Sequence, residues 1–234
     1  MKTIGLIGGL SWVSTEKYYH IINQSVYEKS HGKHASAKII LCSVDCGEIL
    51  GKGGFYWSEN WDAAEDIIVN AANALERTDN VDVILICSNT AHSVAQAIMK
   101  SCRIELLHII DTVANAIKKQ NLKKIALLGT KPTMEKEFYI SQLNDYGLEV
   151  LVPKLKDRNI IHRIIETELV QNKITLSAKQ QYIHIINKLA MQGAEGVILG
   201  CTEIGLLIKQ QDVGIPVFDT TELHAQAAVD FALS

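Results

Sequence analysis

The sequence is poor in helix-breaking residues and in features that would place the protein on a membrane or on nucleic acid. Only three of its 234 residues are proline, and no low-complexity stretch or linker stands out. No apolar run approaches the roughly 20 residues that are needed to span a bilayer. No run of Lys and Arg forms a basic stripe of the kind that binds nucleic acid. We therefore expect neither a membrane nor a nucleic acid as a partner.

Cysteine is scarce, and its distribution argues against two common kinds of site. The five cysteines are odd in number and form no C-x-x-C pair, which does not favour a disulfide framework. No Cys or His pair has recognised ligand spacing beside another pair, so we expect no metal. We interpret Cys42, Cys46 and Cys102 as small buried apolar residues. Met1 begins a predicted strand without a signal-peptide layout, which predicts a cytoplasmic protein.

What the sequence does contain is a regular alternation of two hydrophobic patterns. Hydrophobic residues make up 47% of the chain and charged residues 21%, and the formal net charge is -3. These values suit a globular protein of one or two domains. Short β-branched runs alternate with longer stretches of helical period, which predicts an α/β fold with parallel sheets. The strand candidates are residues 3–7, 38–44, 81–86, 106–110, 124–128, 149–152, 196–199 and 216–218.

The two halves of the sequence resemble each other at three points, in the same order. Three matches in register predict a duplicated fold, with four strands and their helices in each half. In open parallel sheets, ligands bind beyond the carboxyl ends of the strands. We therefore expect the active site in the cleft between two lobes. The matching pairs are 4–9 with 125–130, 83–90 with 197–203, and 109–112 with 217–220.

A glycine-rich turn follows the first predicted strand. The stretch 8–11 lacks the G-x-G-x-x-G spacing of a dinucleotide site. The backbone amides of a tight turn can hold a carboxylate, which makes Leu10 and Ser11 candidate substrate-binding residues. A purely structural turn is the alternative interpretation.

The stretch 88–92 follows the third predicted strand and opens a helix. Backbone N–H groups there favour an anion, and the Asn89 amide and the Thr90 hydroxyl add donors. The alternative is that Asn89 or Thr90 only caps the helix. Two adjacent polar residues directly after a buried strand favour the ligand site. We interpret His92, one turn further on, as structural.

Cys201 ends the matching strand of the second half. A thiolate at a helix N-terminus has a lowered pKa, which suits a base or a nucleophile. A strand-end cysteine alone is typical of packing, but the matching strand end at Ser88 makes Cys201 the strongest catalytic candidate. Glu203 is expected to orient the thiol or the substrate ammonium group, or to be a first-turn acid that favours the helix dipole.

These motifs resemble the aspartate/glutamate racemase family over essentially the whole chain, and most closely its bacterial branch specific for L-aspartate and L-glutamate. The resemblance implies two similar lobes, each with a four-stranded parallel sheet flanked by helices. Lobe 1 would comprise residues 1–112, completed by the C-terminal helix 220–234, and lobe 2 would comprise residues 113–219. The matching stretches are 7–12, 88–92, 127–134, 199–203 and 216–220.

The resemblance also implies an activity. It implies an isomerase without pyridoxal phosphate, other cofactor or metal, which acts on a small acidic amino acid and forms a homodimer. Two residues on opposite faces of the substrate Cα, here Cys201 and Ser88, would remove and return its proton. The substrate-binding residues would be Leu10, Ser11, Asn89, Thr90, Thr130, Thr133, Thr202 and Glu203.

Two features depart from the family pattern. Ser88 stands where most members carry cysteine, and Cys87, one residue earlier, would point to the opposite face of the strand. A thiol has a reference pKa of about 8.5, and serine is a far poorer base. We therefore predict an asymmetric enzyme, in which Cys201 acts on the L-substrate and Ser88 serves the other face only weakly. Archaeal aspartate racemases hold the distal carboxylate with a basic residue in the loop after the second strand. The loop 47–61 of this chain contains only Lys52, and second-lobe alternatives are Arg158, Arg163 and Lys173.

Two other functions remain open at this point. A lone thiol opposite a hydroxyl also suits a decarboxylase or a cis–trans isomerase of the same superfamily. A ligand-binding protein that has lost half of its proton relay is the non-enzymatic alternative.

Overall fold

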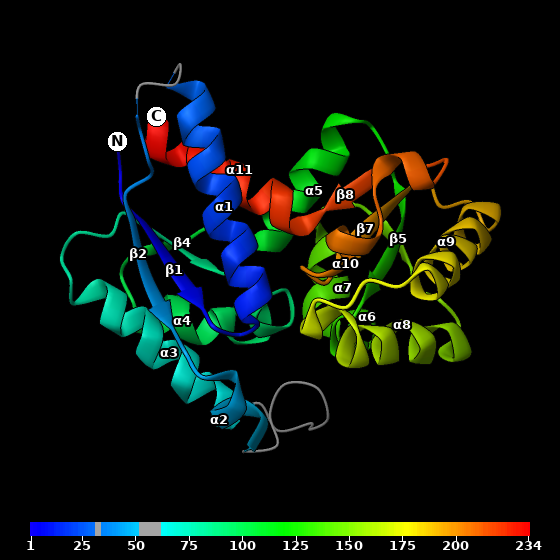
Figure 1. Ribbon diagram of the computed structural model, residues 1–234, viewed down its shortest axis with the longest axis horizontal. Helices are drawn as coiled ribbons and strands as arrows, with labels where there is room; N and C mark the ends of the chain where they lie inside the picture. Colours follow the sequence, from blue (N-terminus) through cyan, green and yellow to red (C-terminus); the bar gives the residue numbers. More distant parts are fainter. Residues whose placement is uncertain (31–33, 52–61) are drawn as a thin grey trace. The chain divides into compact units, whose positions relative to one another are not determined.

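The computed structural model describes residues 1–30, 34–51 and 62–234. The chain forms two compact units, which are coloured along the sequence in Figure 1. Unit 1 comprises residues 1–109 and 221–234, and unit 2 comprises residues 110–220. Within the described ranges, no helix combines the length and the apolar character that crossing a membrane requires.

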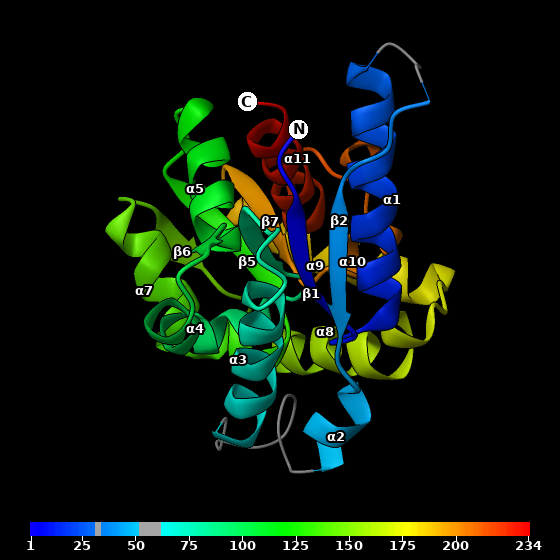
Figure 2. The same cartoon turned by 90° about the vertical axis from the view of Figure 1, so that its left-hand side faces the viewer.

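Unit 1 is built on a parallel four-stranded sheet of order β2-β1-β3-β4. Figure 2 shows β1 and β2 lying between helices α1 and α3. The strands are β1 (Ile4–Gly8), β2 (Ile39–Ser43), β3 (Val83–Ile86) and β4 (Glu105–Leu106). The helices are α1 (Trp12–Lys29), α2 (Cys46–Gly51), α3 (Asp62–Glu76), η1 (Thr90–Val94), α4 (Ala95–Ser101) and α11 (Thr220–Leu233).

Unit 2 repeats this order with a parallel sheet β6-β5-β7-β8. One core cluster packs helices α8 and α9 against β5 and β7. The strands are β5 (Lys124–Gly129), β6 (Glu149–Leu151), β7 (Gly196–Gly200) and β8 (Val217–Asp219). The helices are α5 (Ile109–Lys119), α6 (Lys131–Glu135), α7 (Glu137–Asp145), α8 (Leu155–Thr167), η2 (Leu169–Gln171), α9 (Leu176–Met191), α10 (Ile204–Leu207) and η3 (Gln210–Asp212).

The sheet of unit 1 is covered on both faces, because the side chains of β1 and β3 alternate between two cores. Val83 and Leu85 pack with α1 and α11, whereas Ile84 and Ile86 pack with α3 and α4. Cys87 continues this alternation onto the α1 and α11 face, where it is fully buried. Strands buried on both faces read as continuous apolar runs, which is why the sequence pattern located them.

The predicted fold class is confirmed: both sheets are parallel, both have four strands, and they share one strand order. One predicted strand is partly wrong. The run 106–110 was expected to be extended throughout, but β4 ends at Leu106 and α5 begins at Ile109. Buried residues Ile109, Val113 and Ile117 recur at helical spacing, so the β-branched pair opens a helix rather than ending a strand.

Candidate active site

The strand order places a switch point in each sheet. β1 lies between β2 and β3, and β5 lies between β6 and β7, so the chain leaves each central strand towards opposite edges. Ligand sites of open parallel sheets form outside the carboxyl ends of the strands at this point. In unit 1 these ends carry the predicted residues Leu10, Ser11, Ser88, Asn89 and Thr90. In unit 2 they carry Thr130, Thr133, Cys201, Thr202 and Glu203.

The turn after β1 is held by its own side chains. Gly9 has a φ of +81°, and a Cβ there would lie 1.9 Å from the Val44 carbonyl oxygen, so only glycine fits. Its N–H donates to Thr15 Oγ1 at 2.9 Å. Ser11 caps α1 by accepting from the Ser14 N–H at 3.4 Å, and Leu10 is buried. The Gly9 amide, one of the amides of this turn, therefore donates within the turn itself.

Ser88 is fixed by a network that the sequence did not predict. It is 8% exposed, and its carbonyl accepts from His92 Nδ1 at 2.7 Å. The Ile109 N–H donates to His92 Nε2 at 3.3 Å, which assigns the proton to Nδ1 in a neutral ring. Burial, followed by the nearby His108 and His224, holds the His92 pKa well below its usual 6.5. His92 is thus a neutral brace for the Ser88 turn, in agreement with its structural interpretation.

Cys87 cannot substitute for Ser88 as a base in this arrangement. Its side chain lies in the apolar core between the sheet and helices α1 and α11, and burial raises the pKa of its thiol far above the usual value. The Ser14 hydroxyl donates to the Cys87 carbonyl at 2.9 Å, which ties the start of α1 to the end of β3. The prediction that Cys87 faces away from the strand end is therefore confirmed.

Asn89 and Thr90 are buried polar residues directly after Ser88. They are 2% and 3% exposed. The predicted helix begins here as a 3-10 turn, η1, before α4, and Asn89 forms no side-chain cap for it. The alternative that Asn89 caps this helix with its side chain is therefore not what the structure shows.

Cys201 lies at the end of β7, where its sulfur is tied to a buried carboxylate. Cys201 Sγ donates to Glu203 Oε2 at 3.0 Å, and the Thr202 hydroxyl donates to the same oxygen at 2.8 Å. The three residues are between 3% and 7% exposed. The geometry favours the first of the predicted roles of Glu203, which is to orient the thiol.

The neighbouring end of β5 is brought close to Cys201 by two facing glycines. Gly129 and Gly200 are register partners, and a Cβ on either would lie within 3.2 Å of Thr133 Cγ2. Thr130 caps α6 by accepting from the Thr133 N–H at 3.4 Å, and the two hydroxyls lie 3.0 Å apart. Both threonines are buried. The absence of side chains at the glycines lets Thr133 pack directly on the strand ends.

The basic residues considered for the distal carboxylate fall into three situations. Arg158 Nε lies 3.0 Å from Glu135 Oε1, so this arginine already has a carboxylate partner. Arg163 and Lys173 are exposed. Lys52 lies outside the described residues. Across the described ranges, no group of three or more His, Cys, Asp or Glu side chains is arranged to hold a metal ion.

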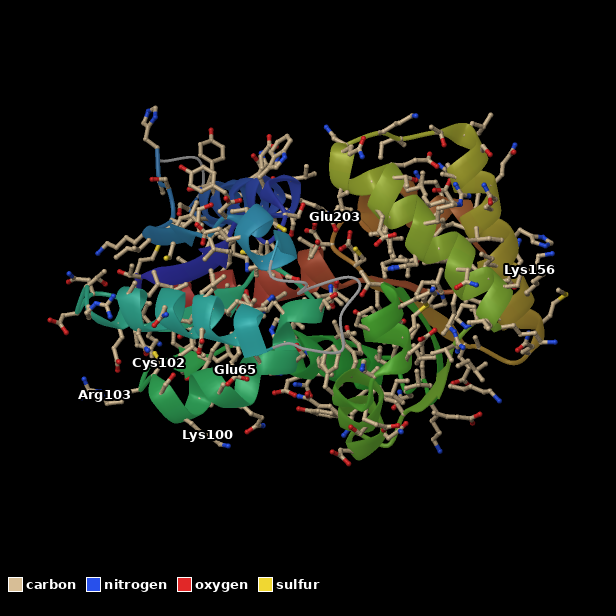
Figure 3. All side chains as sticks on the ribbon, turned by 90° about the horizontal axis from the view of Figure 1, so that it is seen from below. Glu65, Lys100, Cys102, Arg103, Lys156 and Glu203 are labelled. Carbon is tan, nitrogen blue, oxygen red and sulfur yellow. The ribbon has the colours of Figure 1, made fainter. Side chains whose placement is uncertain are left out.

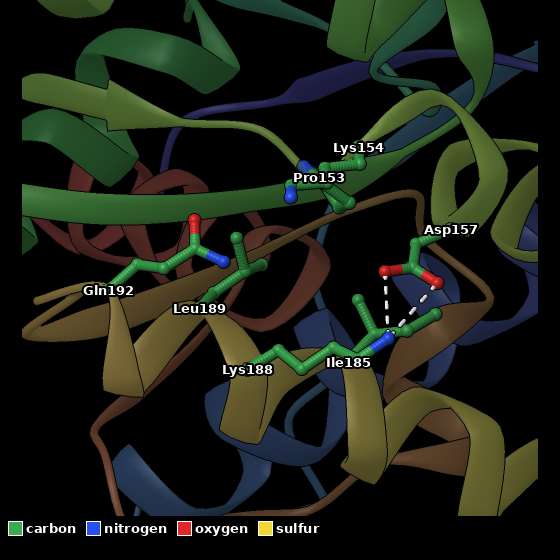
Figure 4. Close-up of a pocket in the computed structure, with 7 residues that line it drawn as sticks. All are labelled: Pro153, Lys154, Asp157, Ile185, Lys188, Leu189 and Gln192. Carbon is green, nitrogen blue, oxygen red and sulfur yellow. Dashed lines mark hydrogen bonds and ion pairs between the residues drawn. The ribbon is translucent and has the colours of Figure 1, made fainter.

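A surface pocket of about 240 Å³ elsewhere in unit 2 carries none of the predicted residues (Figure 4). Two of its charged groups are paired with each other, since Lys188 Nζ lies 3.2 Å from Asp157 Oδ2. The strand ends therefore remain the best candidates for chemistry. The pocket is lined by Pro153, Lys154, Asp157, Ile185, Lys188, Leu189 and Gln192.

Polar side chains lie at the switch point of each sheet, with a thiol among them in unit 2, and comparison with known proteins identifies the family to which this arrangement belongs. A family model described as Asp/Glu/Hydantoin racemase matches residues 7–228. The chain therefore belongs to the Asp/Glu/hydantoin racemase family and is an isomerase.

Solved structures and a curated relative agree with this assignment. A candidate Asp/Glu racemase from Yersinia pestis is 46% identical over all of both chains, with a TM-score of 0.89. An aspartate racemase homologue from Pyrococcus horikoshii is 36% identical over all of both chains, with a TM-score of 0.85. The broad-specificity amino-acid racemase of Bacillus subtilis is 25% identical over 74% of each chain.

Proposed function

We propose that this protein is a cofactor-independent racemase of a small acidic amino acid, with L-aspartate or L-glutamate as substrate. The support is the family membership together with one observation: Cys201 is a buried thiol, oriented by a hydrogen bond, at the switch point of its sheet. A relative from Picrophilus torridus, 25% identical over 99% of this chain and 94% of its own, is an aspartate racemase.

The proposed chemistry assigns one proton to each of two residues. The base form of Cys201 is the thiolate, and Glu203 Oε2, at 3.0 Å, is the acceptor for the thiol proton within the turn. The thiolate removes the Cα proton of the L-substrate and becomes a thiol. Ser88 gives its hydroxyl proton to the opposite face and is reprotonated by water, and the proton held by Glu203 returns to the hydroxide that this leaves. Fixed donors such as the Asn89 amide stabilise the carboxylate as charge develops on it.

The serine makes the exchange of the Cα proton with solvent unequal for the two enantiomers. A hydroxyl donates a proton to a carbanion readily but removes one from Cα poorly, because its pKa is far above that of a thiol. The Cys201 thiol, by contrast, can exchange its proton with solvent and return deuterium to the face that it deprotonated. In D₂O the L-substrate should therefore exchange its Cα proton faster than it racemises.

The test incubates the protein with each enantiomer of aspartate and glutamate in D₂O. NMR follows the loss of the Cα proton, and chiral chromatography follows the enantiomer ratio. Rapid deuteration of the L-form, slower racemisation and still slower deuteration of the D-form are the expected pattern. Equal rates of Cα deuteration for both enantiomers would contradict the asymmetric pair.

A second candidate function is favoured by the same serine. A single cysteine opposite a group that is not a thiol also suits a decarboxylase or a cis–trans isomerase of this superfamily. Turnover of a malonate or a maleate, without Cα deuteration of any acidic amino acid, would establish that function instead.

A further inference from the structure

Three hydrogen bonds fix Ser88 at the end of β3. The Ser88 N–H donates to the Ile86 carbonyl at 2.8 Å, and the Ser88 carbonyl accepts from His92 Nδ1 at 2.7 Å. The Ser88 hydroxyl oxygen accepts from the Ala91 N–H at 3.4 Å, and this bond leaves the hydroxyl proton available for donation. Of the three partners, only His92 acts through its side chain, so it is the one that a substitution can remove.

The His92 ring is itself held in one tautomer and one orientation. The Ile109 N–H donates to Nε2 at 3.3 Å, which makes Nε2 an acceptor and places the proton on Nδ1. The bond to Ser88 agrees, because a carbonyl oxygen can only accept. The ring is 3% exposed and packs edge-on against His108 and His224, with centroids 4.6 and 5.8 Å away. A turn of the ring would break both bonds together.

The neighbouring His224 strengthens this packing without binding Ser88. Its Nε2 donates to the Leu107 carbonyl at 2.7 Å, so its Nδ1 accepts from the Tyr18 hydroxyl at 2.8 Å. These bonds join α1, α11 and the segment after β4 around the His92 ring. His224 thus forms a fixed wall of the cluster, whereas His92 makes the bond to the Ser88 carbonyl.

The matching strand end of unit 2 carries an orienting side chain of a different kind. There the Cys201 thiol donates to Glu203, which lies on the turn between β7 and α10 (Figure 3). In unit 1 the orienting side chain comes four residues after Ser88 and binds its carbonyl rather than its hydroxyl. A contact of this kind fixes the backbone that carries the hydroxyl and does not engage the hydroxyl itself.

We propose that His92 is a positioning residue for the second proton transfer, because its Nδ1–H fixes the Ser88 carbonyl and thereby aims the Ser88 hydroxyl. This inference rests on the proposed function. His92 takes no proton from the substrate in this role. A displacement of about 1 Å at a reacting group can cost about 100-fold in rate. Loss of the Nδ1 bond should therefore slow the step that uses Ser88 and spare the step that uses Cys201.

Two substitutions separate the two nitrogens of the ring. The amide nitrogen of an asparagine side chain falls near the position of Nδ1, whereas the end of a glutamine side chain reaches the position of Nε2. His92→Asn therefore keeps a donor for the Ser88 carbonyl. His92→Gln keeps an acceptor for the Ile109 N–H but loses the bond to Ser88. The pair thus tests which of the two bonds matters to the reaction.

The experiment follows L-aspartate and L-glutamate in D₂O with the full chain. NMR measures Cα deuteration, which needs Cys201, and chiral chromatography measures racemisation, which also needs Ser88. His92→Gln should lower the ratio of racemisation to deuteration by at least about tenfold, because the hydroxyl is no longer aimed. His92→Asn should restore this ratio to within about threefold of the wild-type value, because the positioning bond is kept.

Tyr18→Phe is the matched control for a loss of stability in the same cluster. It removes the buried hydrogen bond to His224 and leaves the side chains of His92 and Ser88 unchanged. Deuteration and racemisation should therefore change by the same factor in this variant. Circular dichroism and a thermal melt establish that the three variants are folded.

A measurement on the wild type needs no variant and no activity. Two-dimensional NMR of the protein with ¹⁵N-labelled histidine identifies the protonated ring nitrogen of each histidine. We expect His92 to carry its proton on Nδ1 at neutral pH. A proton on Nε2 would overturn the inference, because the ring could then not donate to the Ser88 carbonyl.

The kinetic outcomes separate this inference from the proposed function. If His92→Gln lowers deuteration and racemisation equally, or if His92→Asn lowers their ratio as much as His92→Gln does, the Nδ1 bond does not position Ser88. The racemase proposal then stands, because the wild type still catalyses both processes. If the wild type neither deuterates nor racemises any acidic amino acid, the proposed function fails and this inference fails with it.

Discussion

At the scale of single residues, the proposed proton transfer depends on which side chain ends each of two strands. Cys87 and Ser88 are neighbours, yet one lies in the apolar core and the other at the strand end. A cysteine at position 87 therefore packs in the core, whereas a cysteine one residue later would stand at the strand end, where a base is expected. This alternation could be predicted from the sequence because side chains in a strand have a period of two.

Cys201→Ala tests the base. The substitution removes the sulfur atom that we propose takes the Cα proton from the L-substrate, and a positioned base contributes about 10²- to 10⁴-fold to rate. We expect Cα deuteration of the L-form to fall by at least about 100-fold. Alanine is smaller than cysteine, so a thermal melt should show only a modest loss of stability. Activity that survives at the wild-type level would remove the proposed mechanism.

Ser88→Cys tests the other side of the pair. A thiol has a reference pKa of about 8.5 and is a far better base than a hydroxyl. Deuteration and racemisation of the D-enantiomer should rise by about tenfold or more, whereas deuteration of the L-enantiomer should change little. The initial rates with both enantiomers measure this shift. A variant without activity on any acidic amino acid would favour the ligand-binding alternative.

At the scale of elements, the strand ends are shaped by glycines whose surroundings differ. Gly9 and Gly147 have nearly the same φ, +81° and +80°. A Cβ at Gly9 would meet the Val44 carbonyl oxygen at 1.9 Å, whereas one at Gly147 would meet nothing within 4 Å. A side chain at Gly147 would therefore meet backbone strain alone, whereas one at Gly9 would meet backbone strain and a steric clash.

Gly9→Ala should therefore destabilise the protein more than Gly147→Ala. A left-handed backbone costs alanine about 1–2 kcal/mol, and forced overpacking adds about 1–3 kcal/mol. We expect the first variant to show both costs and the second variant only the strain. Urea unfolding followed by circular dichroism measures the difference. Equal losses would mean that the turn between β1 and α1 relaxes around the added methyl group.

The hydrophobic period of the sequence predicted the strands and helices well, but it did not predict the side-chain contacts between them. Both sheets, their four strands and the strand ends follow from apolar runs in the sequence. The brace from His92 to the Ser88 carbonyl depends on Ile109, which begins a helix seventeen residues further on. A one-dimensional pattern carries no signal for such a contact. The strand expected over 106–110 has a different cause, because the β-branched pair at 109–110 also belongs to the helical pattern of α5.

At the scale of the whole molecule, buried histidines make stability depend on pH. Burial lowers the pKa of His162 to about 4 and that of His224 to about 3, and it also holds His92 well below 6.5. The folded protein keeps these rings neutral, whereas the unfolded chain protonates them below pH 6.5. Stability is therefore complete above that value and is lost as the pH falls below it.

Urea unfolding between pH 7.5 and pH 4.5 should show this loss. Each histidine contributes a slope of up to roughly 1.4 kcal/mol per pH unit below its unfolded pKa. Glu166, whose pKa is raised by burial, opposes part of the effect. His162→Gln should flatten the profile, and the exposed His20→Gln should leave it unchanged. A wild-type profile that is level across this range would contradict the neutral, buried state of these rings.

The homodimer implied by the family stays a prediction. The chain has a mass of 25.9 kDa, so a dimer would have about twice this mass. Light scattering coupled to gel filtration measures it directly. A mass equal to that of one chain, at concentrations where the protein is active, would show that the monomer is sufficient.

The position of helix α11 has a consequence for how the protein is made. α11 follows all of unit 2 in the sequence but packs on α1 in unit 1, and the Lys2 N–H donates to the Ala232 carbonyl at 2.9 Å (Figure 1). The ribosome therefore delivers every residue of unit 2 before the helix that closes the hydrophobic core of unit 1. Until α11 is synthesised, the apolar face of unit 1 that this helix covers stays exposed. We therefore expect chaperones to bind the nascent N-terminal half during translation.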